Sequence, residues 1–187
     1  KCRKAELKPS CVVLVATIRA LKMHGGVEKD DLKKENLDAL KKGMPNLERH
    51  INNIKKFGLE VIVAINHFIT DTEKEVKIIQ EQCGKLGVKV SLCTHWSDGG
   101  KGTKDLANNV VEICKKSDTS KFKYLYSDQI PILEKVEKIA KEIYSAKGIE
   151  VDEEIKEQVK KIEQAGFGKF PVCIAKTQYS FSTDPKL

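Results

Sequence analysis

The sequence lacks most features that assign a chain to a class at first sight. It has no apolar run near the roughly 18 residues that a membrane-spanning helix requires, and no leader in which an apolar segment follows a basic start. It also has no internal repeat or low-complexity tract. We therefore expect neither a secretory signal nor a membrane partner. Aromatic residues are scarce, at 6% with a single Trp.

A disulfide or metal framework is missing as well. The six cysteines never form a C-x-x-C pair, and no cluster of Cys and His has the spacing of a structural metal site. Cys11, Cys93 and Cys173 lie inside apolar runs, where a free thiol packs as a small hydrophobe. These observations predict a reducing compartment, no structural zinc and no metal-ligating residues among the site residues.

The phosphate loop G-x-x-x-x-G-K-[ST] is also absent, so these residues cannot by themselves grip a triphosphate in that way. The formal net charge of +7 favours an anionic partner such as nucleic acid. Many lysines, however, stand beside glutamates, as at residues 73–75 and 135–138, which is typical of solvated helical faces. A basic single-stranded RNA-binding module therefore stays open as an alternative function.

What is present is enough sequence for a globular core. The chain has 187 residues, of which 40% are hydrophobic and 33% are charged. We expect a parallel α/β core with ligand-binding loops over residues 1–118, and a smaller part with helices and a final strand over residues 119–187.

Three apolar runs predict neighbouring strands of a parallel sheet: residues 11–16, 61–65 and 88–93. The central run is apolar throughout, as expected for a strand buried on both faces. We expect the loops that follow the three strands to meet at one edge of the sheet. In open α/β sheets, ligands bind at this carboxyl edge.

The intervening segments predict helices. Apolar residues over 37–54 recur at helical spacing, with Pro45 predicting either a kink or a second helix that starts there. A capping box at Thr72 and Glu75 predicts the start of the next helix, and residues 104–116 predict another.

The last third of the chain predicts helices over residues 133–144 and 152–165 and a fourth strand over residues 172–175. The segment 176–182 follows that strand, and its role stays open.

Two aromatic residues occupy equivalent positions after the predicted strands. Phe68 and Trp96 each follow the end of a strand by three residues, so the two rings can face one another and sandwich a flat heterocycle. The alternative is that both rings plug the end of the sheet.

The loop after the first strand suits a small anion. Lys22 supplies a cation, His24 a hydrogen-bonding group, and Gly25 and Gly26 a backbone that a ligand can approach closely. The alternative is that the two glycines form only a turn, with Arg19 paired to a nearby carboxylate.

Asn66 and Asp71 resemble the Asn-Lys-x-Asp signature with which some phosphate-loop hydrolases hold a base, although the spacing is longer and His67 replaces the lysine. Alternatively, Asp71 helps to cap the next helix. The glycine-rich residues 99–102 fit a phosphate cradle, the GXXG loop of an RNA-binding KH module, or a plain turn.

Four motifs in the same order resemble the formate–tetrahydrofolate ligase family along essentially the whole chain. They are residues 15–26, residues 63–72, Trp96 with residues 99–102, and residues 166–168 with residues 175–182. The resemblance implies a cytoplasmic ligase of one-carbon metabolism with a half built like the phosphate-loop hydrolases. Such an enzyme uses ATP with Mg to convert formate into formyl phosphate, and transfers the formyl group to tetrahydrofolate.

The resemblance also implies roles for residues. Phe68 and Trp96 fall on the pair that holds the pterin ring. The loop from Lys22 to Gly26 lies near formyl phosphate, with Lys22 and His24 as catalytic candidates, and Asn66 and Asp71 lie near the nucleotide.

In the family, a phosphate loop lies upstream of the residues matched here, and more chain follows them. We therefore expect an internal portion of the enzyme, with small-molecule substrates and the rest of the enzyme as partners and no nucleic acid. The intact enzyme is expected to be a homo-oligomer, whereas the isolated chain is expected to fold without catalysing.

Overall fold

The computed structural model describes residues 3–175 and residue 181. The chain divides into two compact units, Lys1–Phe122 and Lys123–Leu187. The division into domains at residue 118 stays a prediction.

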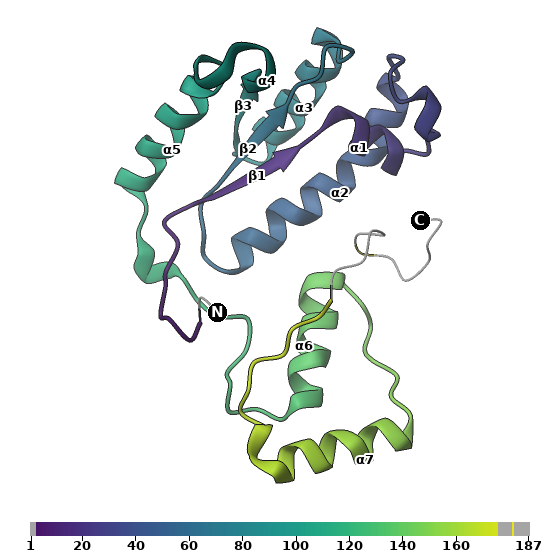
Figure 1. Cartoon of the computed structure of the whole chain (residues 1–187), viewed down its shortest axis with the longest axis vertical. Coiled ribbons are helices and arrows are strands. Elements are labelled where there is room, and N and C mark those ends of the chain that lie inside the picture. The colour runs from purple at the N-terminus through teal and green to yellow at the C-terminus, as the bar shows by residue number, and fades with distance from the viewer. Residues whose placement is uncertain (1–2, 176–180, 182–187) are drawn as a thin grey trace. The chain divides into compact units, whose positions relative to one another are not determined.

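The first unit is built on a three-stranded parallel sheet in the order β1-β2-β3 (Figure 1). The strands are β1 (Val12–Ala16), β2 (Val61–Asn66) and β3 (Lys89–Cys93). The central strand β2 pairs with both neighbours, and its first five residues are buried, as a strand covered on both faces requires. The predicted α/β fold with a parallel sheet is therefore confirmed.

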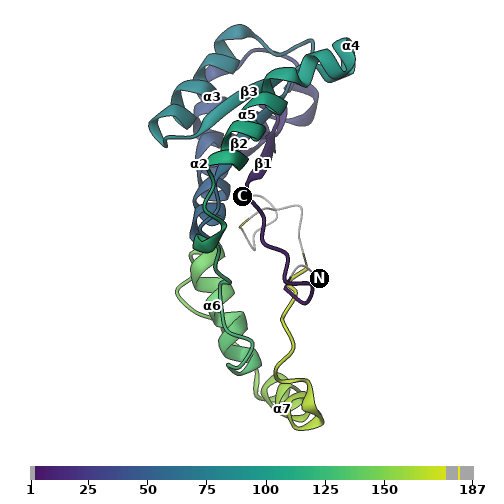
Figure 2. The same ribbon diagram turned by 90° about the vertical axis from the view of Figure 1, so that its left-hand side faces the viewer.

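Helices flank both faces of this sheet. Helices α2 (Leu37–Lys56) and α3 (Glu73–Lys85) cover one face, and α5 (Lys104–Lys116) lies against β3 on the other (Figure 2). Alternation along β3 explains the two faces, because Val90 and Leu92 pack on the apolar core, whereas the Ser91 hydroxyl donates to Asp105 of α5 at 2.6 Å.

Short elements complete the first unit. They are α1 (Ile18–His24), α4 (His95–Asp98), and 3-10 turns over Lys29–Asp31, Gly99–Thr103 and Thr119–Lys121.

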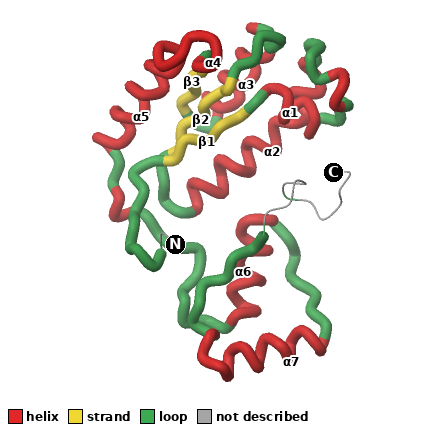
Figure 3. Tube along the Cα trace, viewed as in Figure 1, coloured by secondary structure: helices red, strands yellow, loops and turns green. Residues whose placement is uncertain are grey.

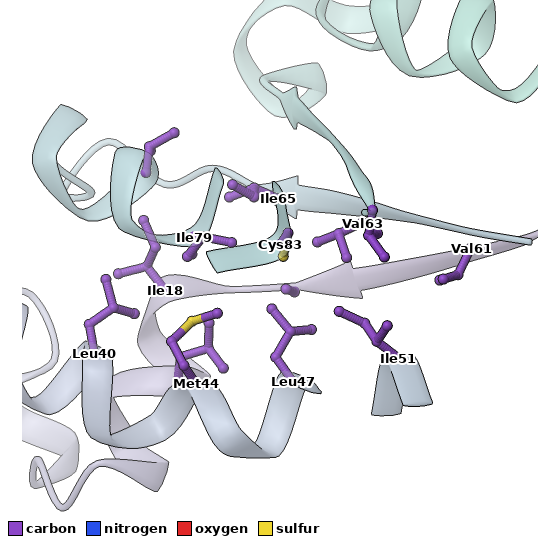
Figure 4. Close-up of a cluster of buried hydrophobic side chains, with 14 residues drawn as sticks. Ile18, Leu40, Met44, Leu47, Ile51, Val61, Val63, Ile65, Ile79 and Cys83 are labelled. Carbon is purple, nitrogen blue, oxygen red and sulfur yellow. The ribbon is translucent and has the colours of Figure 1, made fainter. Parts of the chain in front are cut away.

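The core lies between β1 and β2 on one side and α1, α2 and α3 on the other (Figure 4). Leu40, Met44, Leu47 and Ile51 of α2 all point into it, which confirms the predicted apolar face. Full burial of each such side chain contributes about 1.5–3 kcal/mol.

The division of α2 at Pro45 is wrong, because a single helix of 20 residues contains this proline. Buried residues both before and after Pro45 anchor the helix on the sheet, and this packing offsets the hydrogen bond that proline cannot make.

The loop predicted after the first strand is also largely wrong, since α1 occupies Ile18–His24. The Thr17 hydroxyl accepts a hydrogen bond from the Ala20 N–H at 3.1 Å and so caps the helix. Ile18 and Leu21, three residues apart, are buried against α2. A seven-residue helix depends on such packing, which local sequence does not reveal.

The predicted capping box of α3 is confirmed. The Thr72 hydroxyl accepts from the Glu75 N–H, and the Glu75 carboxylate accepts from the Thr72 N–H at 3.0 Å. The helix ends shortly before Gly87, whose φ of 67° lies in the left-handed region that favours glycine.

The second unit contains α6 (Ile132–Tyr144), α7 (Glu153–Ile162) and a π-helical turn over Glu163–Phe167. Its only buried cation among the described residues is Lys135, whose ammonium donates to the carbonyls of Gly168 at 2.6 Å and Phe170 at 3.0 Å.

The predicted strand over residues 172–175 is wrong, because the described part of this unit consists of helix and loop (Figure 3). The Val172 N–H donates to the Tyr126 hydroxyl, and that hydroxyl donates to the Val172 carbonyl. A tyrosine side chain, and not a neighbouring strand, thus satisfies the backbone N–H and carbonyl of Val172. Residues 176–180 and 182 of the following segment lie outside the described residues.

No helix in the described ranges is long and apolar enough to cross a membrane.

Candidate functional site

The site lies at the carboxyl edge of the sheet, where the ends of the three strands are in register. Ala16 pairs with Ile65, and Asn66 pairs with Cys93. The His67 N–H extends the ladder by donating to the Cys93 carbonyl at 3.1 Å. The segments after β1, β2 and β3 therefore leave the sheet beside one another.

Phe68 is half-buried, and one face of its ring carries a cation. The guanidinium carbon of Arg19 lies 4.1 Å from the ring centroid, within the range of a cation–π contact. Arg19 also donates to the Thr70 hydroxyl at 3.2 Å. Arg19 is therefore not paired with a carboxylate among the described residues, contrary to the alternative considered from sequence.

Trp96 lies on α4 and is anchored to the same turn. Its indole Nε1–H donates to the His67 carbonyl at 3.0 Å, although the side chain is 58% exposed. Trp96 is thus not part of the core. The structure shows no ring contact between Phe68 and Trp96, so a sandwich formed by these two rings stays a prediction.

Asp71 is 8% exposed and holds the turn closed, with its Oδ2 accepting from the Phe68 N–H at 2.8 Å. Its Oδ1 is buried without a hydrogen-bond partner, as is Nε of Arg19. One buried acceptor and one buried donor are thus left unsatisfied beside the Phe68 turn, and each such group costs about 1–3 kcal/mol unless water or a ligand satisfies it.

Lys22 is completely buried. Its ammonium lies 2.8 Å from Oε1 of Glu75, also completely buried, and donates to the Lys34 carbonyl at 2.8 Å. The same Oε1 accepts from the Asn36 N–H at 3.2 Å. Glu75 therefore joins α1, the N-terminus of α2 and the N-terminus of α3.

Burial by itself would raise the pKa of the Glu75 carboxyl, but hydrogen bonds from Lys22 and from the Thr72 and Asn36 N–H groups, with the charge of Lys22, lower it. The pair is thus a fixed structural element beside the candidate loop. A catalytic role for Lys22 stays a prediction, and its burial favours a supporting role.

The residues after Lys22 differ in what they offer a ligand. Burial lowers the pKa of His24, which favours a neutral imidazole near pH 7. A Cβ at Gly25 would lie 1.9 Å from the Ala39 carbonyl oxygen, so this glycine permits close packing on α2. Gly26, with φ of 91° and open space around it, is the position at which a ligand can approach the backbone.

The glycine-rich residues 99–102 lie in the 3-10 turn Gly99–Thr103, which agrees with the turn considered from sequence. The Thr94 N–H donates to the Gly102 carbonyl at 3.1 Å, and a Cβ at Gly102 would lie 2.6 Å from the Thr94 hydroxyl oxygen. The segment is thus folded back on the end of β3.

The described residues contain no group of three or more His, Cys, Asp or Glu placed to hold a metal ion. The sequence-based site residues missed Arg19 and Glu75. The capping box indicated the local role of Glu75, but no sequence pattern indicated its pairing with Lys22.

The fold is that of an α/β protein with an open parallel sheet, and its carboxyl edge, where ligands bind in folds of this class, carries an exposed indole, a half-buried phenyl ring and unsatisfied buried polar groups. The comparisons with known proteins give the particular family. The chain belongs to the formate–tetrahydrofolate ligase family, whose profile, described as "Formate--tetrahydrofolate ligase", matches residues 1–187.

Several similar proteins carry the same name. The one from Pelagibacter ubique is 64% identical over 187 residues, which are 100% of this chain and 33% of that protein. Those from Hyphomonas neptunium and Beijerinckia indica are 59% and 55% identical, again over 100% of this chain and 34% of each protein. The chain thus spans about a third of the length of these relatives.

Proposed function

We propose that the chain is an internal portion of an ATP-dependent ligase that forms 10-formyltetrahydrofolate from formate and tetrahydrofolate through formyl phosphate. The observation that carries this proposal is the match of the whole chain to the ligase family. In this proposal the intact enzyme is a cytoplasmic homo-oligomer, and the other two thirds of the polypeptide complete its active site.

The pterin of tetrahydrofolate binds at Phe68 and Trp96 in this proposal. Arg19 covers one face of Phe68, so the pterin stacks on the other face, with the exposed indole of Trp96 available as the second wall. Stacking holds the attacking nitrogen near the formyl carbon and so supplies orientation.

The nucleotide base binds at Asn66 and Asp71. The unsatisfied, buried Oδ1 of Asp71 suits the exocyclic amine of a purine, which would donate the missing hydrogen bond. The described residues offer no cluster for Mg, so the proposed contribution of this chain to ATP binding concerns the base.

His24 and Gly26 lie beside the formyl phosphate. A neutral His24 can accept a proton from the folate amine as its nitrogen bonds to the formyl carbon, while the bond from that carbon to the phosphate oxygen breaks and inorganic phosphate leaves. Lys22 stabilises this loop through its ion pair with Glu75.

The proposal is tested by titrating the chain with tetrahydrofolate while following the fluorescence of Trp96, its only Trp. We expect saturable quenching that changes little between 50 and 300 mM salt, because stacking is not screened by ions. Free N-acetyltryptophanamide corrects for absorption by the folate.

A matched pair of variants tests whether tetrahydrofolate binds at Phe68. Phe68→Leu should weaken folate binding by about fivefold, since a stacked ring contributes on the order of 1 kcal/mol. Phe57→Leu changes a ring at the end of α2 and should leave the titration unchanged. No response to folate, with a salt-sensitive response to a single-stranded oligonucleotide, would instead favour the RNA-binding module.

Catalysis by the isolated chain is a separate question. We expect purified residues 1–187 to show no ATP-dependent formylation of tetrahydrofolate, since no phosphate loop occurs within them. Measurable product above a blank without ATP would contradict this part of the proposal.

A further inference from the structure

Arg19 links two segments that are far apart in the sequence. It belongs to α1, yet its guanidinium lies 4.1 Å from the centroid of the Phe68 ring and donates to the Thr70 hydroxyl at 3.2 Å. The backbone of Phe68 is held by Asp71, whose carboxylate accepts a hydrogen bond from the Phe68 N–H. The ring thus has a fixed backbone and a fixed partner on one face.

We propose that Arg19 is a positioning residue that fixes the Phe68 ring and, through its charge, makes the open face of this ring selective for an electron-rich planar guest. The selectivity rests on the proposed function, in which the pterin stacks on Phe68. The positioning does not depend on it.

Two contacts support the positioning role. A phenyl ring can rotate about its terminal torsion, and a guanidinium that lies over one face of the ring favours one orientation. The hydrogen bond to Thr70 holds the guanidinium in place, since it fixes the group to the same turn that carries the ring. Lysine has a cation but neither the plane nor the fork of donors, so it reproduces only part of this arrangement.

The charge supports the selectivity. The face of a phenyl ring carries negative potential, and a cation on one side draws electron density toward itself. The opposite face is then less negative, so it attracts electron-rich rings more strongly and cationic rings less strongly. Because Nε of Arg19 is buried without a partner, no carboxylate neutralises the guanidinium at that atom.

The charge of Arg19 should distinguish reduced from oxidised folates. The reduced ring of tetrahydrofolate is richer in electrons than the oxidised ring of folic acid, while both molecules carry the same anionic tail. Arg19 should therefore favour the reduced form beyond any preference due to shape.

The first experiment measures dissociation constants of tetrahydrofolate and folic acid by Trp96 quenching in the wild-type chain and in Arg19→Met, Arg19→Lys and Lys74→Met variants. We expect Arg19→Met to weaken tetrahydrofolate binding by about three- to tenfold. Arg19→Met should weaken folic acid binding less, so the preference for tetrahydrofolate over folic acid should become smaller. Arg19→Lys should retain part of this preference. Lys74 is exposed on α3, so Lys74→Met controls for the loss of one positive charge toward an anionic ligand.

The second experiment needs no ligand. The Trp96 indole donates a hydrogen bond to the carbonyl of His67, the residue before Phe68. The emission maximum of Trp96 and its quenching by acrylamide therefore report on this turn. We expect both to change in Arg19→Met while far-UV circular dichroism and the melting temperature stay close to wild type.

Different results would contradict the positioning role of Arg19 and the selectivity. An unchanged Trp96 signal in Arg19→Met overturns the positioning role, and an equal loss of affinity for both folates overturns the selectivity. If the wild-type chain binds neither folate, the proposed folate site and the selectivity fail together, and the ligand-free signal still decides whether Arg19 positions the turn.

Discussion

At the scale of single residues, the buried pair of Lys22 and Glu75 is the group whose loss should matter most for stability. Glu75→Gln leaves the Lys22 ammonium buried with only the Lys34 carbonyl, and we expect it to cost about 3 kcal/mol of the free energy of unfolding. Lys22→Met should cost less, because the Glu75 carboxylate keeps its two backbone N–H donors.

Urea unfolding of both variants and of the double variant measures the coupling directly. Glu81→Gln serves as control, since Glu81 makes an exposed contact with Lys77 at 4.0 Å and should change stability by less than about 0.5 kcal/mol. Additive losses in the double variant would show that the pair has no energetic coupling.

The lowered pKa of Glu75 predicts a pH dependence with a definite sign. A carboxyl whose pKa is lower in the folded state stabilises the protein above its unfolded pKa of about 4.3, and this contribution is lost as the pH falls through the folded pKa. The difference in stability between wild type and Glu75→Gln should therefore be constant near neutral pH and should shrink below about pH 4. Denaturation curves from pH 3 to pH 7 test this, and a constant difference over that range would contradict it.

At the scale of elements, the close approach of α1 and α2 depends on a glycine. A Cβ at Gly43 would lie 1.9 Å from the Leu21 carbonyl oxygen, and backbone cannot move aside as a side chain can. We expect Gly43→Ala to destabilise the protein by about 2 kcal/mol or more, even though alanine is the better helix former.

Gly84→Ala is the matched control within α3, because nothing lies within 4 Å of its added Cβ. There the helix preference of alanine should dominate, with a gain of up to about 0.5–1 kcal/mol. Thermal unfolding of the two variants should therefore shift in opposite directions, and equal shifts would show that the α1–α2 contact tolerates a methyl group.

The elements that sequence predicted are those with local signals. The strand at β2 is a continuous apolar run, and the start of α3 is marked by its capping box. By contrast, α1 packs on α2 through a glycine-mediated contact, and the backbone of Val172 pairs with the Tyr126 hydroxyl, 46 residues away. Neither is visible in a short window of sequence.

The same holds for the candidate site. Residues at strand ends were identifiable because parallel strands end at one edge, and Phe68, Trp96 and Asp71 lie there. The partners that define their environment are distant in sequence: Arg19 reaches Thr70 across 51 positions, and Asn36 reaches Glu75 across 39. Pairings of this kind follow from the fold and not from local pattern.

At the scale of the whole molecule, the two compact units differ in how many apolar side chains they bury. The contiguous apolar core consists of residues between Ala16 and Val88, all in the unit Lys1–Phe122. In the described part of the second unit, the buried residues are Tyr126 and the polar Lys135. Apolar burial is the main stabilising contribution in folding, so the two units should differ in their ability to fold alone.

We therefore expect residues 1–122, expressed alone, to unfold cooperatively in urea with a midpoint close to that of the full chain when followed by Trp96. Residues 123–187 alone should show no cooperative transition by circular dichroism, because Tyr126 is their one buried hydrophobic side chain among the residues described. A version ending at residue 98 is the control. It lacks α5, which covers β3 and contacts β2, and should be less stable because it exposes Ile62 and Ala64. Cooperative unfolding of residues 123–187, or its absence from residues 1–122, would show that stability is distributed over both units and not concentrated on the sheet.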